Sequence, residues 1–209
     1  MVINIIICIL LGYLFGCFST GFFIGKIKKI DIRQYGSKSS GTTNALRTLG
    51  PKAGALTLLG DMLKALIVIL LVRFVFFSNL DYVRLLSLYT GLGVVLGHNY
   101  PVWLKFKGGK GIASTAGAMV AFDPLIIPFA LPVFLISVAI TRYVSVGSLL
   151  IAMMFPIWTA IRNPGEVHML LVAFVYTILA FIKHSANIKR LLNGTENKLG
   201  QRVKIDKMG

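Results

Sequence analysis

Residues 2–25 read VINIIICILLGYLFGCFSTGFFIG and contain no charged side chain. The run is too long for the core of a signal peptide and no cationic segment precedes it, so it predicts a retained membrane span. Similar runs recur along the chain, which is 56% hydrophobic and has a mean hydropathy of +0.80. This composition predicts an all-α integral membrane protein in which residues 1–209 form a single membrane-embedded domain.

The remaining apolar runs predict further helices, for a total of seven transmembrane helices. They cover residues 53–77, 82–97, 112–122, 125–141, 143–161 and 167–182. The run 112–122 is short enough to be a re-entrant or interfacial segment instead. Asp123 and Pro124 provide a natural turn after it. Two crossings, or one re-entrant excursion, keep the basic segments on either side of this region on the same face.

The charges of this chain indicate its orientation. It carries 22 Lys and Arg against 7 Asp and Glu, a net charge of +15. In a chain this apolar, the excess is more typical of cytoplasmic loops than of nucleic-acid binding. With seven spans, one face holds every cation except Arg73, Arg84, Arg162 and the intramembrane Lys64. We therefore expect an N-terminus outside, a basic cytoplasmic tail over residues 183–209 and no nucleic-acid partner.

Three polar segments share the predicted cytoplasmic face. The first, residues 35–50 (YGSKSSGTTNALRTLG), combines glycines, hydroxyls and a helix start at 42–44 that carries Arg47. Backbone amides at a helix start suit an anion. The alternative is an ordinary capped loop whose Arg47 faces lipid headgroups.

The second segment, residues 97–114 (GHNYPVWLKFKGGKGIAS), places Lys110 among three glycines just before another helix start. The glycines let the chain approach a ligand with exposed amides, and Lys110 adds a positive charge. The spacing does not fit a Walker A loop, because no Ser or Thr follows the lysine. A cytoplasmic turn with ordinary loop lysines is the alternative.

The third segment, residues 183–198 (KHSANIKRLLNGTENK), places His184, Asn187 and Arg190 on one helix face. A polar stripe that contacts lipid headgroups is the alternative. Three anion-binding segments on one face together predict a phosphate-rich substrate at the membrane surface.

Other kinds of chemistry leave no signal in the sequence. No histidine has an Asp five residues later, no Gly-x-Ser-x-Gly motif is present, and no metal-ligand spacing appears, although neighbours in space stay open. We therefore expect no metal and no other cofactor. Asp61 and Lys64 lie three residues apart within one span and predict a structural ion pair. Cys8 and Cys17 lie on opposite helix faces and predict no disulfide.

The motifs GSKSSGTTNALR, GHNYPVWLKFKGGKGIA, TRYVSVGS and KHSANIKRLLNGTENK occur in this order along the chain. In these motifs the chain resembles the bacterial acyl-phosphate:glycerol-3-phosphate acyltransferases, the PlsY family, over nearly its whole length. The first motif departs from the family pattern, because Lys38 and Ser39 replace Gly-Asn and Thr42 replaces Ala.

The resemblance implies seven spans with an external N-terminus, in a bacterial plasma membrane, and an active site in cytoplasmic loops. It implies transfer of a fatty acyl group from acyl phosphate to the sn-1 hydroxyl of glycerol 3-phosphate. The products would be lysophosphatidic acid and phosphate, in the first committed step of phospholipid synthesis. The partners would be these two substrates, membrane lipid and an enzyme that produces acyl phosphate.

The resemblance also implies roles for individual residues. The catalytic residues would be Ser37, Arg47, Lys110 and His184, and the substrate-binding residues Thr43, Asn44, Gly108, Gly109, Asn187 and Ser148. Cations are needed to hold two phosphates close together and to stabilise developing charge. Acyl phosphate has a good leaving group, so an oxygen of the substrate's own phosphate can accept the hydroxyl proton. Whether His184 acts as a base or only binds substrate stays open.

Two other classes of membrane protein compete with this interpretation. A transporter for organic phosphates would place charges near the midplane and is commonly built from repeated halves. This chain has only Asp61 and Lys64 deep in a span and shows no repeat. A membrane scaffold would use its basic loops to bind anionic lipid and would tolerate single substitutions in the glycine loop.

Overall fold

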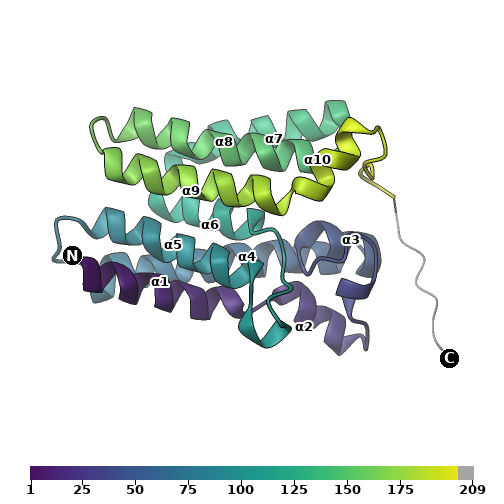
Figure 1. Ribbon diagram of the computed structural model, residues 1–209, viewed down its shortest axis with the longest axis horizontal. Helices are drawn as coiled ribbons and strands as arrows, with labels where there is room; N and C mark the ends of the chain where they lie inside the picture. Colours follow the sequence, from purple (N-terminus) through teal and green to yellow (C-terminus); the bar gives the residue numbers. More distant parts are fainter. Residues whose placement is uncertain (202–209) are drawn as a thin grey trace.

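The computed structural model describes residues 1–201, and all regular secondary structure in this part of the chain is helical (Figure 1). The α-helices are α1 (Val2–Cys17), α2 (Thr20–Ile27), α3 (Thr42–Leu49), α4 (Pro51–Leu71), α5 (Val83–Asn99), α6 (Ile112–Phe122), α7 (Ile127–Thr141), α8 (Val144–Arg162), α9 (Val167–Lys183) and α10 (Ser185–Leu192). Short helical turns lie at η1 (Ile32–Gln34), η2 (Val72–Phe76), η3 (Val102–Leu104) and η4 (Pro124–Ile126). The all-α prediction is confirmed for these residues, and the helices follow the predicted runs closely.

The first apolar run is not one continuous helix. It bends at Phe18 and Ser19, which are extended, so that α2 leaves the direction of α1 (Figure 1). Another sharp join lies between α3 and α4, where Gly50 has a φ of 92° and Pro51 opens the next helix. A positive φ favours glycine, and proline is well tolerated at a first helical position.

The helices form two groups with α6 between them (Figure 1). In the first group, α1 packs along α5, and α4 packs against both α5 and α6; in the second, α8 packs against α7 and α9. Small residues explain the close approach of α1 and α5. A side chain at Gly12 or Gly16 would overlap the α5 backbone, and one at Gly93 or Gly97 would overlap α1. Small residues at helix interfaces are typical of membrane proteins.

Four segments are long and apolar enough to cross a bilayer within residues 1–201. They are Val2–Ile27, Pro51–Phe76, Pro124–Thr141 and Val144–Arg162, and the bent pair α9–α10 is a fifth if it counts as one span. Helix α5 has 17 residues and α6 only 11. The number of seven spans and their orientation therefore stay predictions.

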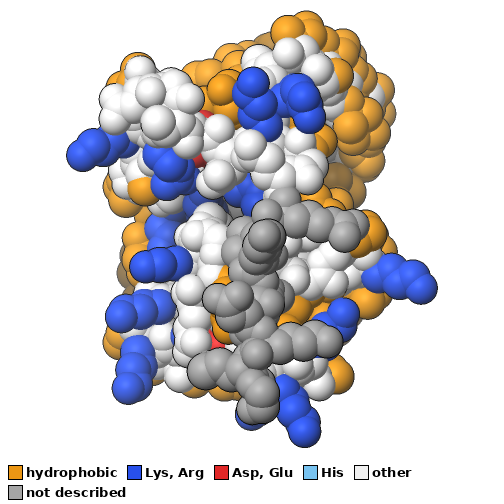
Figure 2. Space-filling model, turned by 90° about the vertical axis from the view of Figure 1, so that its right-hand side faces the viewer, with side chains coloured by type: hydrophobic (Ala, Val, Ile, Leu, Met, Phe, Trp, Pro, Cys, Tyr) orange, Lys and Arg blue, Asp and Glu red, His pale blue; other side chains and the backbone are white. Residues whose placement is uncertain are grey.

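The three polar segments meet at one end of the molecule, at the right of Figure 1, where α3, α10 and the loop from 100 to 111 lie. Figure 2 views this end directly and shows Lys and Arg side chains around its rim. The convergence of these segments, expected from their charges, is thus present in the fold. The predicted tail cations Arg202, Lys204 and Lys207 lie outside the described residues.

Candidate functional site: a cavity with a cationic end and an apolar end

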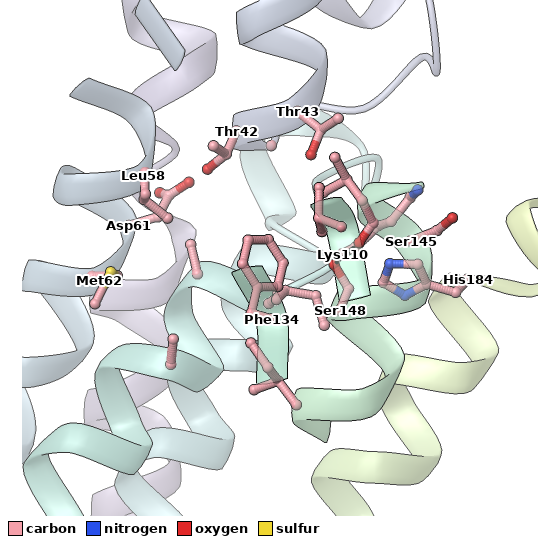
Figure 3. Close-up of a pocket in the computed structure, with 18 of the residues that line it drawn as sticks. Thr42, Thr43, Leu58, Asp61, Met62, Lys110, Phe134, Ser145, Ser148 and His184 are labelled. Carbon is pink, nitrogen blue, oxygen red and sulfur yellow. Dashed lines mark hydrogen bonds between the residues drawn. The ribbon is translucent and has the colours of Figure 1, made fainter. Parts of the chain in front are cut away.

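A cavity of about 690 Å³ opens at the polar end of the molecule and extends along α6 toward the apolar interior. Figure 3 shows Leu58 and Met62 of α4 on one side and Ser148 and His184 on the other. The predicted site residues that line it are Ser37, Thr43, Asn44, Arg47, Lys110, Ser148, His184 and Asn187. Four segments far apart in the sequence, at 37–47, 110, 148 and 184–187, therefore contribute to one site.

Asn44 organises the loop that precedes α3. Its side-chain amide donates to the carbonyls of Ile32 (2.7 Å), Tyr35 (3.2 Å) and Ser39 (2.8 Å), and its Oδ1 accepts from the backbone N–H of Ser37 at 2.9 Å. Both amide hydrogens are therefore used within the loop. Asn44 shapes the wall that presents Ser37 and Thr43 to the cavity, and it offers a ligand no free N–H.

Arg47 reaches the cavity from the last turn of α3. It is 8% exposed, and its Nη2 donates to the backbone carbonyl of Asn197 at 3.0 Å. Burial lowers the pKa of this guanidinium; the Glu196 carboxylate opposes the shift and the Arg190 charge adds to it. Arginine stays charged despite such a shift, so the cavity wall carries a permanent, partly desolvated cation.

Lys110 supplies the second cation. Its Nζ donates to Oδ1 of Asn187. Burial lowers the pKa of Lys110 to about 8; Glu196 opposes this shift and the nearby arginines Arg190 and Arg47 add to it. An ammonium held close to two guanidinium groups favours the binding of an anion beside them.

Glu196 is the central carboxylate of the polar end, and the sequence analysis missed it. It is buried, and its Oε1 accepts from the Asn187 amide at 2.7 Å and from the Ser145 hydroxyl at 3.2 Å. Its Oε2 accepts from Nε of Arg190 at 2.7 Å. This single side chain joins α8 to α10 and fixes the amide that holds Lys110. Arg190, predicted to share a face with His184 and Asn187, is taken up by this ion pair.

His184 lies just after α9, with 2% of its surface exposed, and lines the cavity. Its Nδ1 is 2.8 Å from the carbonyl oxygen of Ala180, which assigns the proton to Nδ1 and leaves the Nε2 lone pair free. Burial, and then the Lys110 charge, lower the pKa of His184 to about 4. The ring is therefore neutral at pH 7 and can accept a hydrogen bond.

Gly108 and Gly109 differ from expectation. Neither lines the main cavity, and their amides donate to the end of α5, from Gly108 to the Asn99 carbonyl at 3.3 Å and from Gly109 to the His98 carbonyl at 3.0 Å. The expectation of exposed amides at these two positions is therefore wrong. Both glycines pack where a side chain would collide with residues of the α5 end, and they deliver Lys110 to the cavity.

Ser148 lines the cavity as predicted, but its hydroxyl donates to the carbonyl of Val144 in its own helix at 2.9 Å. Its oxygen can still accept a hydrogen bond. The predicted ion pair of Asp61 and Lys64 is present at 3.0 Å, and both side chains are buried. The fold also brings His98 to 3.6 Å from the Asp61 carboxylate, a His–carboxylate neighbour that the sequence spacing did not reveal.

The other half of the cavity is mostly apolar, although Asp61 lines it between Leu58 and Met62 (Figure 3) and His98 also borders the cavity. Its wall is formed by side chains of α4, α6 and α7, namely Leu58, Met62, Ala113, Ala116, Val120, Leu131, Phe134 and Leu135. Helix α7 packs mainly against α8 and leaves this space between itself and α4. Leu131 and Leu135 are more than half exposed at the surface that the apolar composition predicts to face lipid. The cavity therefore suits a molecule with an anionic head and a hydrocarbon chain.

The chain was compared with known proteins. The family model described as glycerol-3-phosphate acyltransferase matches residues 6–194. A glycerol-3-phosphate acyltransferase of Clostridioides difficile (strain 630) is 43% identical over 210 residues, covering 96% of this chain and 98% of the relative. One from Bacillus subtilis (strain 168) is 38% identical and covers 93% of this chain and 97% of the relative.

Two crystal structures share the fold. Both are of PlsY, an integral membrane glycerol 3-phosphate acyltransferase, one in its glycerol 3-phosphate form and one in its lysophosphatidic acid form. The first has a TM-score of 0.84 at 35% identity and the second a TM-score of 0.82 at 34% identity, and each covers 94% of this chain and 96% of the solved one. The family model, the curated relatives and the shared fold together show that this chain belongs to the PlsY family of glycerol-3-phosphate acyltransferases.

Proposed function

We propose that this protein transfers a fatty acyl group from acyl phosphate to the sn-1 hydroxyl of glycerol 3-phosphate, which yields lysophosphatidic acid and inorganic phosphate. The observation that carries the proposal is a single cavity in which Arg47 and Lys110 lie at one end and apolar side chains of α4, α6 and α7 at the other. Both substrates are anions, and the donor and the lipid product are amphiphiles. The solved relatives named for glycerol 3-phosphate and for lysophosphatidic acid support the same pair of ligands here.

In this proposal, Lys110 lies between the two phosphates. Arg47, His184 and Asn187 hold the glycerol phosphate, and Ser37 and Thr43 hold the head of the acyl phosphate. Ser148 contributes an accepting oxygen, whereas Asn44, Gly108 and Gly109 act through the shape of their loops. Two cations that grip adjacent phosphates bring the hydroxyl next to the carbonyl and stabilise negative charge as it develops.

The transfer step requires one new bond and one broken bond. The glycerol hydroxyl oxygen bonds to the acyl carbonyl carbon, and the bond between that carbon and the phosphate oxygen breaks, so the electron pair leaves with phosphate. The hydroxyl proton passes to an oxygen of the acyl phosphate's own phosphoryl group. The neutral His184, with its pKa near 4, is a weak base and serves to orient the hydroxyl.

We further propose that the protein lies in a bacterial plasma membrane with seven spans and with the cavity mouth in the cytoplasm, supplied by a separate acyl-phosphate-producing enzyme. Cys8 and Cys17 are buried, which suits labelling at introduced cysteines. In intact cells, a membrane-impermeant maleimide should label Asp81→Cys and spare Lys189→Cys. Labelling of Lys189→Cys from outside would overturn the orientation.

The activity test uses purified protein in detergent with palmitoyl phosphate and glycerol 3-phosphate, and measures released phosphate and lysophosphatidic acid. Palmitoyl-CoA and palmitoyl acyl carrier protein replace the donor in parallel reactions. We expect product only in the reaction whose acyl donor is palmitoyl phosphate. A transporter or scaffold would give no product with any donor, and equal rates with palmitoyl-CoA would overturn the donor assignment.

The apolar end of the cavity leads to a prediction about chain length. Ala116→Phe should fill part of the apolar end of the cavity and lower kcat/KM for palmitoyl phosphate by about 10-fold or more, because each methylene group that loses its contact costs about 0.8 kcal/mol. Octanoyl phosphate should be affected much less. The control Ile136→Phe adds the same ring on the exposed side of α7. An equal loss for both donors in Ala116→Phe would contradict this assignment.

The pKa of Lys110 leads to a prediction about pH. The ammonium is protonated below its pKa of about 8, so kcat/KM should fall as the pH rises above 8. Lys110→Arg keeps its charge far above this range and should lose this basic limb, even with a lower maximum. The fall in kcat/KM below pH 6 is expected from protonation of the substrate phosphate, whose second pKa is about 6, so Lys110→Arg should show the same fall. A profile from pH 5 to 9.5 checks this, and an unchanged basic limb in Lys110→Arg would assign it elsewhere.

A further inference from the structure

Beneath the glycine loop lie three buried ionisable side chains that the proposed transfer step does not use, although two of them, Asp61 and His98, also border the cavity. Asp61 and Lys64 of α4 are 0% and 6% exposed, and His98 at the end of α5 is 2% exposed. Burial of charge between membrane helices is costly unless the groups are paired, and it often marks function.

Lys64 is the centre of this cluster. Its Nζ donates to Oδ1 of Asp61 at 3.0 Å and to the carbonyls of Gly16 (3.1 Å) and Phe18 (2.7 Å), where α1 ends. It also lies 2.9 Å from Nδ1 of His98. The ammonium has three hydrogens for these four acceptors, so one hydrogen is shared between two of them. Because an ammonium only donates, Nδ1 of His98 is an acceptor and the ring proton is assigned to Nε2. Lys64 therefore fixes both the tautomer and the orientation of the ring.

The oriented ring supports the glycine loop at two points. The backbone carbonyl of His98 accepts from the N–H of Gly109 at 3.0 Å. Nε2 of the ring occupies the place that a Cβ at position 109 would need. Gly109 does not have a positive φ, unlike Gly111 at 80°, so its backbone conformation does not require glycine. Glycine is required here because the His98 ring leaves no room for a side chain.

We propose that His98, held by Lys64 and Asp61, is a positioning residue that sets the depth of the glycine loop and thereby the place of Lys110 in the cavity. The inference rests on the proposed function for its kinetic consequence. Lys110 directly follows the glycine that lies on the ring. A misplacement of about 1 Å in a catalytic group costs on the order of 100-fold in rate. The role therefore predicts a defect in turnover with the fold intact.

The closest test is a double-mutant cycle on Gly109 and His98. Gly109→Ala should lower kcat by about 10-fold or more, because its methyl group displaces the ring or the loop. In the background of His98→Ala, the same Gly109→Ala change should cost less than about 2-fold, because the colliding ring is gone. Contacting residues couple, whereas independent sites add. If Gly109→Ala lowers kcat by the same factor in both backgrounds, the glycine serves a purpose independent of His98 and the proposal fails.

His98→Asn separates positioning from stability. Its amide oxygen can still accept from Lys64, so the buried ammonium keeps a partner, but the part of the ring that lies on Gly109 is missing. We expect an unfolding temperature close to that of the wild type together with a kcat lowered by about 10-fold. The control Tyr176→Phe removes a buried hydrogen bond to the Leu88 carbonyl (2.6 Å) far from the loop and should keep its kcat. A wild-type kcat in folded His98→Asn would overturn the proposal.

Binding of inorganic phosphate by calorimetry keeps this inference separate from the proposed function. Lys110→Ala should weaken phosphate binding, and His98→Asn should weaken it by about 5-fold or more through the misplaced loop. If the wild type transfers no acyl group, the proposed function fails, and the phosphate affinities still decide the positioning role. Equal affinities in His98→Asn and the wild type would contradict that role.

Discussion

Lys110→Ala is expected to lower kcat/KM for palmitoyl phosphate and glycerol 3-phosphate by at least about 100-fold, the usual cost of removing one preorganised donor to a developing negative charge. The loss has two parts. The variant removes the ammonium between the two phosphates, and it leaves Oδ1 of the buried Asn187 without the donor that now holds it. Initial rates of phosphate release over a grid of both substrate concentrations measure the effect.

The matched control for this variant is Lys107→Ala. Lys107 lies three residues earlier in the same loop, is exposed and does not line the main cavity. The two variants remove the same charge from the same loop, so general electrostatic attraction of anions is altered equally. We expect Lys107→Ala to stay within about 3-fold of the wild type. Similar losses in both would favour diffuse attraction over a defined contact.

Arg47→Ala should produce a loss of similar size, about 100-fold or more. Within residues 1–201, the guanidinium of Arg47 is the one cavity-lining cation that does not titrate in the working range of pH, and its planar fork can hold a phosphate through two hydrogen bonds. Arg47→Lys keeps the charge but not the fork, so it should recover only part of the activity. We expect the KM for glycerol 3-phosphate to rise more than that for palmitoyl phosphate, because Arg47 is assigned to the former.

Arg47 also contacts the Asn197 carbonyl, so its loss could act by releasing the segment after α10. Arg142 provides the control, because it is exposed and donates from its Nη2 to the Leu199 carbonyl of the same segment at 3.4 Å. Arg142→Ala should keep kcat within about 3-fold. A comparable loss in both variants would show that Arg47 matters as a tether and not as a phosphate ligand.

The helices could be predicted from the sequence because the backbone N–H and C=O groups of an apolar run find no water to bond with in a membrane. A helix pairs these groups within the run itself. The run at 112–122 appears unchanged as α6. The bend at Phe18 and Ser19 was not predicted, since no proline or charge marks it. Charge also predicted which polar segments would meet, because all of them belong to one face.

Finer features of the site depend on contacts that one sequence cannot reveal. Glu196 lies in a basic tail, and its partners Ser145 and Arg190 become apparent only when α8 and α10 pack together. Asp61 and His98 are far apart in the chain and meet through Lys64. The glycines of KFKGGKG correctly predicted that Lys110 lies at the cavity. They also led to the wrong prediction that the amides of Gly108 and Gly109 bind a ligand, because their bonds to the end of α5 leave no mark in the sequence.

Those amides have a consequence for movement in the catalytic cycle. They bond the loop that carries Lys110 to the end of α5, and α5 packs closely against α1 at glycines. This loop therefore has little freedom to move toward a bound molecule. The segment after α10 on the opposite wall is also held. Glu196 accepts from Ser145, Asn187 and Arg190, and Arg47 and Arg142 donate to carbonyls of the same segment. With both walls held in this way, we expect a substrate to enter a largely preformed site with little rearrangement of either wall.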